Sequence, residues 1–172
     1  SALVDFTKSS IEAGKAFDSA MSQVAATMGV TVNQVGELRD FAQEMGATTA
    51  FSATEAAQGL NILAMAGLSA NEQMAALPQV LDLAAAGTLA LDDAASYVTG
   101  TIKGFKDKMG NAQYYTDLIA KGATLANTSV TGLGEAMSRG AATASGYGQT
   151  ANSLALSLLR LAEQNLEGGE AA

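Results

Sequence analysis

The stretch Gly46–Ala95 most constrains what this chain can fold into, because it is a series of short apolar segments with their own helix start and stop signals. Ser52 is followed three residues later by Glu55, and Ser69 by Glu72. This spacing is typical of a capping box, in which the hydroxyl and the acid cap each other's backbone N–H groups in the first turn of a helix. The pattern therefore predicts two compact helices and indicates nothing about function.

Four glycines indicate where helices end, since a left-handed residue closes a helix and glycine adopts that conformation at little steric cost. They are Gly29, Gly46, Gly67 and Gly87. Thr31 and Gln34 repeat the capping-box spacing upstream. Pro78 lies inside the predicted helix from Ser69 to Gly87 and lacks a backbone donor. We expect a kink or a break there, the alternative being a second short helix that starts at the proline.

Apolar side chains recur at spacings of three and four residues, and no comparable stretch alternates with period two. The sequence therefore predicts an all-α bundle of about seven or eight short antiparallel helices. The stripes are Ala56, Leu60, Leu63, Gly67; Met74, Leu77, Leu81, Ala84; Leu91, Ala95, Val98, Ile102, Phe105; and Tyr115, Leu118, Gly122, Leu125. Further helices are expected at Val32–Met45 (with Val35, Leu38, Ala42 and Met45 inward), Asn111–Leu125, Thr131–Ala142 and Gln149–Leu166.

A longer N-terminal helix is indicated by a strict alternation of four- and three-residue steps. Its seam is Phe6, Ser10, Ala13, Phe17, Ala20, Val24 and Met28. This spacing favours a helix that faces the core, with an oligomerising coiled coil as the alternative.

The length of 172 residues suits one all-helical domain over residues 1–172, with residues 1–110 and 111–172 as alternative sub-units. Units of roughly twenty residues close at glycines, which indicates an irregular helix–turn periodicity rather than a clean solenoid repeat. Residues 1–29 are amphipathic and charged, so we expect neither a signal peptide nor a membrane-spanning segment.

Cysteine and histidine are both absent, which excludes disulfides, thiolate and imidazole metal sites and Ser–His–Asp catalysis. We therefore predict no catalytic, cofactor-binding or metal-binding residue. An enzyme would need carboxylates alone, and Glu55, Glu72 and Glu135 are the candidates only by default. Asp92 and Asp93 are adjacent, so on a helix they point to different faces and are better explained as an N-terminal cap.

The net charge of −8 argues against direct nucleic-acid binding, because neutralising phosphates needs clustered Lys and Arg. No basic residue lies between Arg39 and Lys103, a stretch that carries seven acids from Asp40 to Asp93. They predict a solvated acidic surface with helix caps; the alternative is a face that docks a basic partner. Lys103, Lys106 and Lys108 indicate a solvated helix end, the alternative being a phosphate or membrane contact.

Several blocks resemble, in order, the core region of phage tail tape measure proteins of the minor-tail family. The blocks are FDSAMSQVAATMG at Phe17–Gly29, GATTAFSATEAAQGLNILAMAG at Gly46–Gly67, ALPQVLDLAAAG at Ala76–Gly87, NTSVTGLGEAM at Asn127–Met137 and EGGEAA at Glu167–Ala172. The segment Gly100–Tyr115 fits the family less well. Family members are much longer, so the resemblance implies that this chain is a fragment.

The resemblance implies a structural, non-enzymatic role in tail length determination and tail assembly, followed by exit from the tube during DNA delivery. The implied partners are tail tube and tail assembly proteins, tail chaperones and other copies of the same protein. The implied locations are the lumen of the virion tail and, during assembly, the host cytoplasm. Membrane contact is implied only for the full-length protein. Two alternatives remain open: a lipid- or envelope-interacting helical module, and a small carboxylate-only lytic enzyme.

Overall fold

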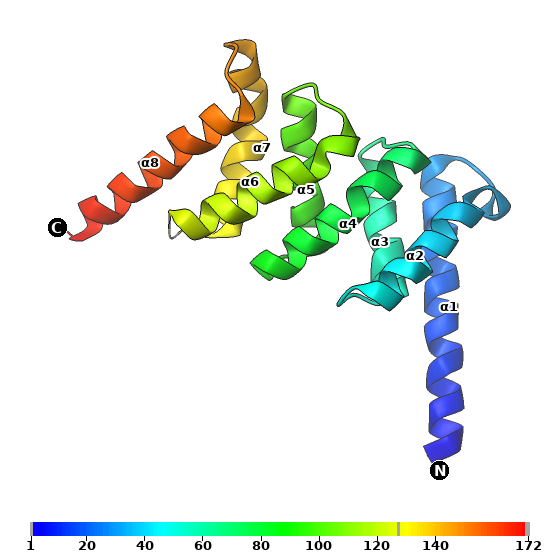
Figure 1. The fold of residues 1–172 in the computed structure, drawn as a ribbon. Helices are drawn as coiled ribbons and strands as arrows, with labels where there is room; N and C mark the ends of the chain where they lie inside the picture. The colour runs from blue at the N-terminus through cyan, green and yellow to red at the C-terminus, as the bar shows by residue number, and fades with distance from the viewer. Residues whose placement is uncertain (1, 127, 171–172) are drawn as a thin grey trace. The chain divides into compact units, whose positions relative to one another are not determined.

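The computed structural model describes residues 2–126 and 128–170, with side chains described for residues 10–126 and 128–164. Within these residues the chain forms eight α-helices, two 3₁₀ turns and no strand (Figure 1). The elements are α1 (Ala2–Met28), η1 (Val32–Val35), α2 (Gly36–Thr48), α3 (Ala53–Met65), α4 (Ala70–Gly87), α5 (Leu91–Gly104), η2 (Met109–Asn111), α6 (Ala112–Leu125), α7 (Val130–Gly146) and α8 (Ala151–Glu170). The predicted all-α class and the longer N-terminal helix are confirmed.

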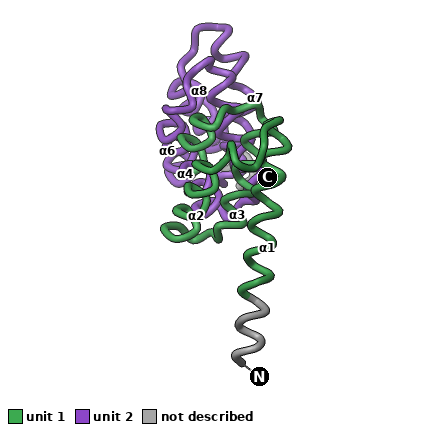
Figure 2. Tube along the Cα trace, turned by 90° about the vertical axis from the view of Figure 1, so that its right-hand side faces the viewer, with its two compact units in different colours: residues 1–77 green, residues 78–172 purple. Residues whose placement is uncertain are grey.

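The chain divides into two compact units, residues 1–77 and 78–172 (Figure 2). The division lies between Leu77 and Pro78, inside α4. It does not coincide with residues 110 and 111, the boundary of the possible sub-units within the single domain that the sequence predicted. The physical reason is that α5, which precedes residue 110, packs against α7, which follows it, so the helices on both sides belong to one unit.

In unit 1, α3 lies against both α1 and α2. The buried side chains are Phe17, Met21 and Val24 of α1, Leu38, Ala42 and Met45 of α2, and Ala56, Leu60 and Leu63 of α3. The predicted seam of α1 faces this core only from Phe17 onward, and Ser10 and Ala13 are exposed. The reason is length, since α1 extends past α2 and α3 toward its N-terminus (Figure 1). The side chain of Phe6 lies outside the described residues.

In unit 2, α5 packs against α7, and α8 packs against both α7 and α6. The fully buried large side chains there are Leu81, Leu83, Ile102, Ile119 and Met137. Alanines fill much of the remaining core, including Ala94, Ala95, Ala112, Ala141 and Ala155. Small side chains let helices approach closely, so contact depends on fit rather than on bulk.

Both strong capping boxes form as predicted. The Glu55 carboxylate accepts the backbone N–H of Ser52 at 2.7 Å, and the Ser52 hydroxyl accepts the N–H of Glu55 at 3.2 Å. Glu72 accepts the N–H of Ser69 at 2.9 Å. The hydrogen bonds from Ser52 hold the pKa of Glu55 below its usual value of 4.5. The third box caps η1 rather than an α-helix, and Gln34 accepts the N–H of Thr31 at 2.9 Å.

Three of the four predicted stop glycines lie at helix ends, but only two of them are left-handed, and the prediction for Gly46 was wrong. Gly29 and Gly67 are left-handed, with φ of 69° and 81°. Gly46 instead lies within α2, where a Cβ would come within 2.7 Å of the Cα of Ala53. Gly87 is the last residue of α4, and a Cβ there would lie 3.0 Å from the Cβ of Val130. The left-handed residue after α4 is Thr88. Gly46 therefore serves a close approach to the backbone of Ala53, and Gly87 leaves room for the side chains of Leu89 and Val130.

Of the kink or break expected at Pro78, the break does not occur, because α4 is one α-helix through the proline, and the kink stays a prediction. Proline removes the hydrogen bond to the carbonyl of Met74, and its ring crowds that carbonyl. Leu77, Val80 and Leu81 flank it and are all buried. Their burial favours a continuous helix over the alternative of a second helix starting at Pro78.

The two halves of the chain repeat one succession of elements. The order α1, η1, α2, α3, α4 is followed by α5, η2, α6, α7, α8. The first helix of each half ends in a left-handed residue, Gly29 with φ of 69° and then Lys106, 77 residues later, with φ of 57°. Burial follows the same offset in the next helix, where Leu38 corresponds to Tyr115 and Ala42 to Ile119.

The third and fourth helices continue the repeat. Ser52 caps α3 and Ser129, again 77 residues later, caps α7. The next left-handed glycines are Gly67 and Gly148, which lie 81 residues apart. The four extra residues are one helical turn, because α3 has 13 residues and α7 has 17. The irregular twenty-residue periodicity predicted from the sequence is therefore part of a twofold internal repeat.

Candidate interaction surface

The contact between α5 and α7 is built on glycines. Gly100 and Gly104 lie one turn apart on α5, and Cβ atoms there would come within 3.1 Å of the Cβ of Ser138 and 2.5 Å of the Cβ of Ala141. From the other side, a Cβ at Gly134 would lie 2.6 Å from the Tyr97 ring. Small residues at this spacing let two helix backbones approach closely.

The buried polar groups of α5 are satisfied within the helix. The hydroxyl of Thr99 donates to the carbonyl of Ala95 at 2.7 Å, and that of Thr101 donates to the carbonyl of Tyr97 at 2.6 Å. Neither hydroxyl is therefore left to bind a ligand. This interface is a closed packing contact.

Asp107 organises the connection between α5 and α6. Its carboxylate accepts the N–H of Lys108 at 2.7 Å, the amide of Asn111 at 2.9 Å and the hydroxyl of Tyr115 at 2.9 Å. The backbone bond from Lys108, followed by the bond from Tyr115, holds the pKa of Asp107 below its usual value of 3.8. Burial and the bond to Asp107 raise the pKa of Tyr115. The network fixes a turn that contains left-handed Lys106.

The predicted basic patch lies on this connection. Lys103 is in the last turn of α5, and Lys106 and Lys108 follow it in the loop. All three are exposed. This placement fits a solvated helix end, where a cation complements the negative end of the helix dipole.

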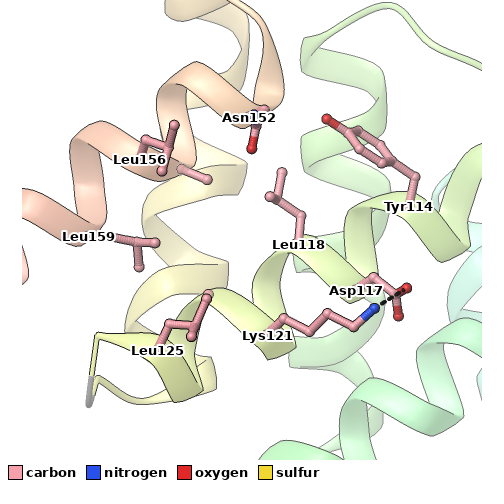
Figure 3. Close-up of a pocket in the computed structure, with 10 residues that line it drawn as sticks. Tyr114, Asp117, Leu118, Lys121, Leu125, Asn152, Leu156 and Leu159 are labelled. Atoms are coloured by element: carbon pink, nitrogen blue, oxygen red, sulfur yellow. Dashed lines mark hydrogen bonds and ion pairs between the residues drawn. The ribbon is translucent and has the colours of Figure 1, made fainter.

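An apolar groove lies between α6 and α8 (Figure 3). It has a volume of about 330 Å³ and is lined by Leu118, Gly122, Leu125, Ala155, Leu156 and Leu159, with Tyr114, Asp117, Lys121 and Asn152 also contributing. Leu125 is 81% exposed and Leu156 is 51% exposed. The ammonium of Lys121 pairs with the carboxylate of Asp117 at 2.9 Å beside the groove. The sequence placed Leu125 in a helical stripe, whereas the structure exposes it.

The default catalytic carboxylates have local partners instead. Glu55 and Glu72 bond to the serines that begin their own helices. Glu135 pairs with Arg139 on α7 at 2.6 Å. Asp92 and Asp93 lie in the first turn of α5 as expected, although neither side chain caps it. Among the described residues, no three acidic side chains gather in a group that could hold a metal ion.

The acids between residues 40 and 93 are exposed, as the sequence predicted, four of them in unit 1 and three in unit 2. Every one of the seven is solvent-exposed, and they are Asp40, Glu44, Glu55, Glu72, Asp82, Asp92 and Asp93. Within the described residues, no helix combines the length and apolar character needed to cross a membrane.

The structure is that of an all-α protein. Its glycine contact between α5 and α7 and its apolar groove between α6 and α8 are both suited to contact between helices. Residues 39–172 match the family model of the phage-related minor tail protein, and the chain belongs to this family. It is 34% identical over 169 residues to the tape measure protein of Pneumococcus phage Dp-1. The match covers 98% of this chain and 15% of that protein. No solved structure matches the chain.

Proposed function

We propose that this chain is a segment of a longer tail tape measure protein, that it acts in tail length determination and tail assembly, and that it is not an enzyme. The observation that carries the proposal is the match over 98% of the chain to a tape measure protein of which it spans only 15%. The minor-tail family match over residues 39–172 supports the same role.

The exposed charge suits a place inside a tail tube. Acidic side chains repel DNA phosphates, so exposed acids such as Asp40 in unit 1, and Asp82 and Asp92 in unit 2, would not retain DNA that passes through the tube. Short helices that pack through alanines and glycines bury little apolar surface and open more easily than a large core, which suits exit through a narrow channel. The proposed location is therefore the tail lumen, with the host cytoplasm during assembly.

The proposed partners are tail tube and assembly proteins, tail chaperones and other copies of the protein. Two exposed features are available for such contacts. One is the part of α1 from Ser10 to Ala16, which lies beyond α2 and α3. The other is the groove between α6 and α8.

Peptide mass spectrometry of purified phage tests the proposed location. We expect peptides from residues 1–172 in intact, protease-treated virions, because the tube wall protects its contents. They should be lost from particles that have released their DNA, while peptides of the tail tube protein, the internal control, remain. Absence of the peptides from intact virions would overturn the proposal.

The two alternatives receive no support from the comparisons. A lipid-interacting module would float with liposomes, and the chain is expected to stay at the bottom of the gradient with neutral and with anionic lipids. A lytic enzyme would clear a peptidoglycan zymogram, and we expect no clearing because Glu55, Glu72 and Glu135 already have local partners.

A further inference from the structure

The single proline of the chain, Pro78, lies where the two compact units divide. Unit 1 ends at Leu77 and unit 2 begins at Pro78, yet both residues belong to α4 (Figure 2). This helix is therefore shared by the two units, and its proline is at the boundary between them.

The first part of α4, residues 70–77, packs against the rest of unit 1. Leu77 fills the space beside Gly59 of α3, where a Cβ would come within 2.7 Å of the leucine Cδ1 atom. The amide of Gln73 is fully buried and donates to the carbonyl of Leu68, in the connection before α4, at 2.8 Å. Close packing and a buried hydrogen bond therefore fix this part of the helix to unit 1.

The second part of α4, residues 78–87, packs in the same way within unit 2. The hydroxyl of Thr116 in α6 donates to the side-chain carbonyl of Gln79 at 3.3 Å. At the other end, Gly87 lies so close to Val130 of α7 that a Cβ would come within 3.0 Å of the valine Cβ. Each part of α4 therefore has tertiary partners in its own unit.

Pro78 makes the junction between these two parts the weakest point of the helix. It removes the hydrogen bond to the carbonyl of Met74, and its ring crowds that carbonyl. Sharp bends in helices occur at such positions. Proline also suits the first position of a helix, where no N–H is needed, so residues 78–87 can stay helical while α4 bends.

The internal repeat supplies a comparison, because α8 is the counterpart of α4. Thr150 caps the start of α8 as Ser69 caps the start of α4, 81 residues earlier. At the same offset, the position of Pro78 is taken by Leu159 in α8. All of α8 lies within unit 2. The proline is thus present in the helix that two units share and absent from the equivalent helix that lies within one unit.

We propose that α4 is a hinge, which bends at Pro78 and lets units 1 and 2 change their mutual orientation as rigid bodies. In hinged proteins a few residues absorb the backbone change while the parts on either side keep their packing. The support is the position of the single proline at the unit boundary, the tertiary partners on both sides of it and its absence from α8. This motion is a property of the chain itself and does not depend on the proposed role in a phage tail.

Pulsed electron paramagnetic resonance tests the hinge, since the chain has no cysteine and spin labels attach only to introduced thiols. One label is placed at Gln43→Cys on α2 in unit 1 and the other at Ser96→Cys on α5 in unit 2, both exposed positions. We expect a broad distribution of distances between the labels. Pro78→Ala should narrow it about twofold, because alanine restores the bond to Met74 and removes the ring.

Two controls separate bending at Pro78 from other effects. A label pair at Ser96→Cys and Thr124→Cys, both exposed and both in unit 2, should give a narrow distribution that Pro78→Ala leaves unchanged. Gly14→Ala is the matched substitution, because nothing lies within 4 Å of its Cβ and it stabilises a different helix. It should leave the distribution between the two units as broad as in the parent chain.

Three results would overturn the inference. The first is a distribution between the units that has the same width with proline and with alanine at position 78. The second is an equal narrowing by Gly14→Ala, which would indicate general stabilisation of helices. The third is a broad distribution within unit 2, which would show that this unit is not a rigid body. Failure of the proposed tail role would leave all three measurements unaffected, so the two proposals fail separately.

Discussion

The contact between α1 and α3 and the contact between α5 and α7 are equivalent in the repeat, yet different chemistry holds them together. In the first, the hydroxyl of Thr27 donates to the side-chain carbonyl of Asn61 at 2.6 Å. In the second, the equivalent positions are Gly104 and Ser138, and the helices approach so closely that no side chain fits at Gly104. One topology therefore tolerates both a polar bridge and direct backbone packing.

The difference teaches where the structure is least tolerant. A polar bridge at an exposed position adds little net stability, because water replaces the lost hydrogen bond. A glycine contact leaves no space, so an added methyl group moves two helices. Substitutions should therefore be most damaging in the second half.

The largest effect is expected for Gly104→Ala. The new Cβ would lie 2.5 Å from the Cβ of Ala141 and 2.8 Å from the backbone N of Ala142, so α5 and α7 must separate. We expect a loss of about 2 kcal/mol in the free energy of unfolding, measured in urea. Gly14→Ala is the matched control, since nothing lies within 4 Å of its Cβ. It should stabilise α1 by about 0.5 kcal/mol, and equal effects of the two changes would contradict the comparison.

The next largest loss of stability is expected at the equivalent N-cap residues of α3 and α7, Ser52 and Ser129. Ser52→Ala removes a capping box and should cost about 1 kcal/mol of unfolding free energy. Ser129 accepts the N–H of Gly132 at 2.9 Å, but position 132 has no carboxylate to return a bond. We therefore expect Ser129→Ala to cost less than Ser52→Ala when both thermal midpoints are compared. A larger cost for Ser129→Ala would show that the reciprocal bond of Glu55 adds nothing.

A smaller effect on stability is expected from the hydrogen bonds of Asp107, and this effect should depend on pH. The equivalent position in the first half is Val30, which has no carboxylate. Because the pKa of Asp107 is lowered in the folded state, its contribution to stability is present above the unfolded value of 3.8. It is lost as pH falls through the lower folded-state pKa. Its exposure limits the size of the effect.

The variant Asp107→Asn should therefore unfold at a lower urea concentration than the parent chain at pH 7, with the gap narrowing as pH falls below about 4. Its control is Asp117→Asn, because Asp117 bonds only to exposed Lys121. A gap that stays constant down to pH 2 would rule out a role for ionised Asp107.

The smallest effect is expected for Thr27→Val, which removes the bridge to Asn61 and keeps the side-chain volume. We expect a loss of about 0.5 kcal/mol in the free energy of unfolding, because the bond is exposed. Thr48→Val is the control, since the hydroxyl of Thr48 donates only to the carbonyl of Glu44 in its own helix. A loss as large as that of Gly104→Ala would show that the polar bridge is as important as the glycine contact.

Local signals explain what the sequence could predict. Helical periodicity and the capping boxes at Ser52 and Ser69 depend on neighbours a few residues away, and both were confirmed. The roles of Gly46 and Gly104 depend on partners on other helices, Ala53 and Ala141, which no local pattern indicates. For the same reason, the sequence placed Ser10 and Ala13 of α1 in the core, although they are exposed. Local spacing does not indicate where α2 and α3 end along α1.

The repeat and the groove needed the structure for a related reason. Equivalent positions share burial rather than identity, as Leu38 and Tyr115 do. The signal that could have revealed the repeat is the pair of segments GLSAN at Gly67–Asn71 and GQTAN at Gly148–Asn152. Leu125 fits a helical stripe as well as any core residue, and its exposure depends on how α6 packs against other helices, which no local pattern indicates.

The most direct test of the proposed role is the tail length of phage in which residues 1–172 are deleted in frame from the full-length protein, measured by electron microscopy. We expect tails that are shorter or fail to assemble, and a helical replacement of the same length should restore length if the segment acts only as a spacer. Tails of unchanged length and normal number in the deletion phage would contradict the account.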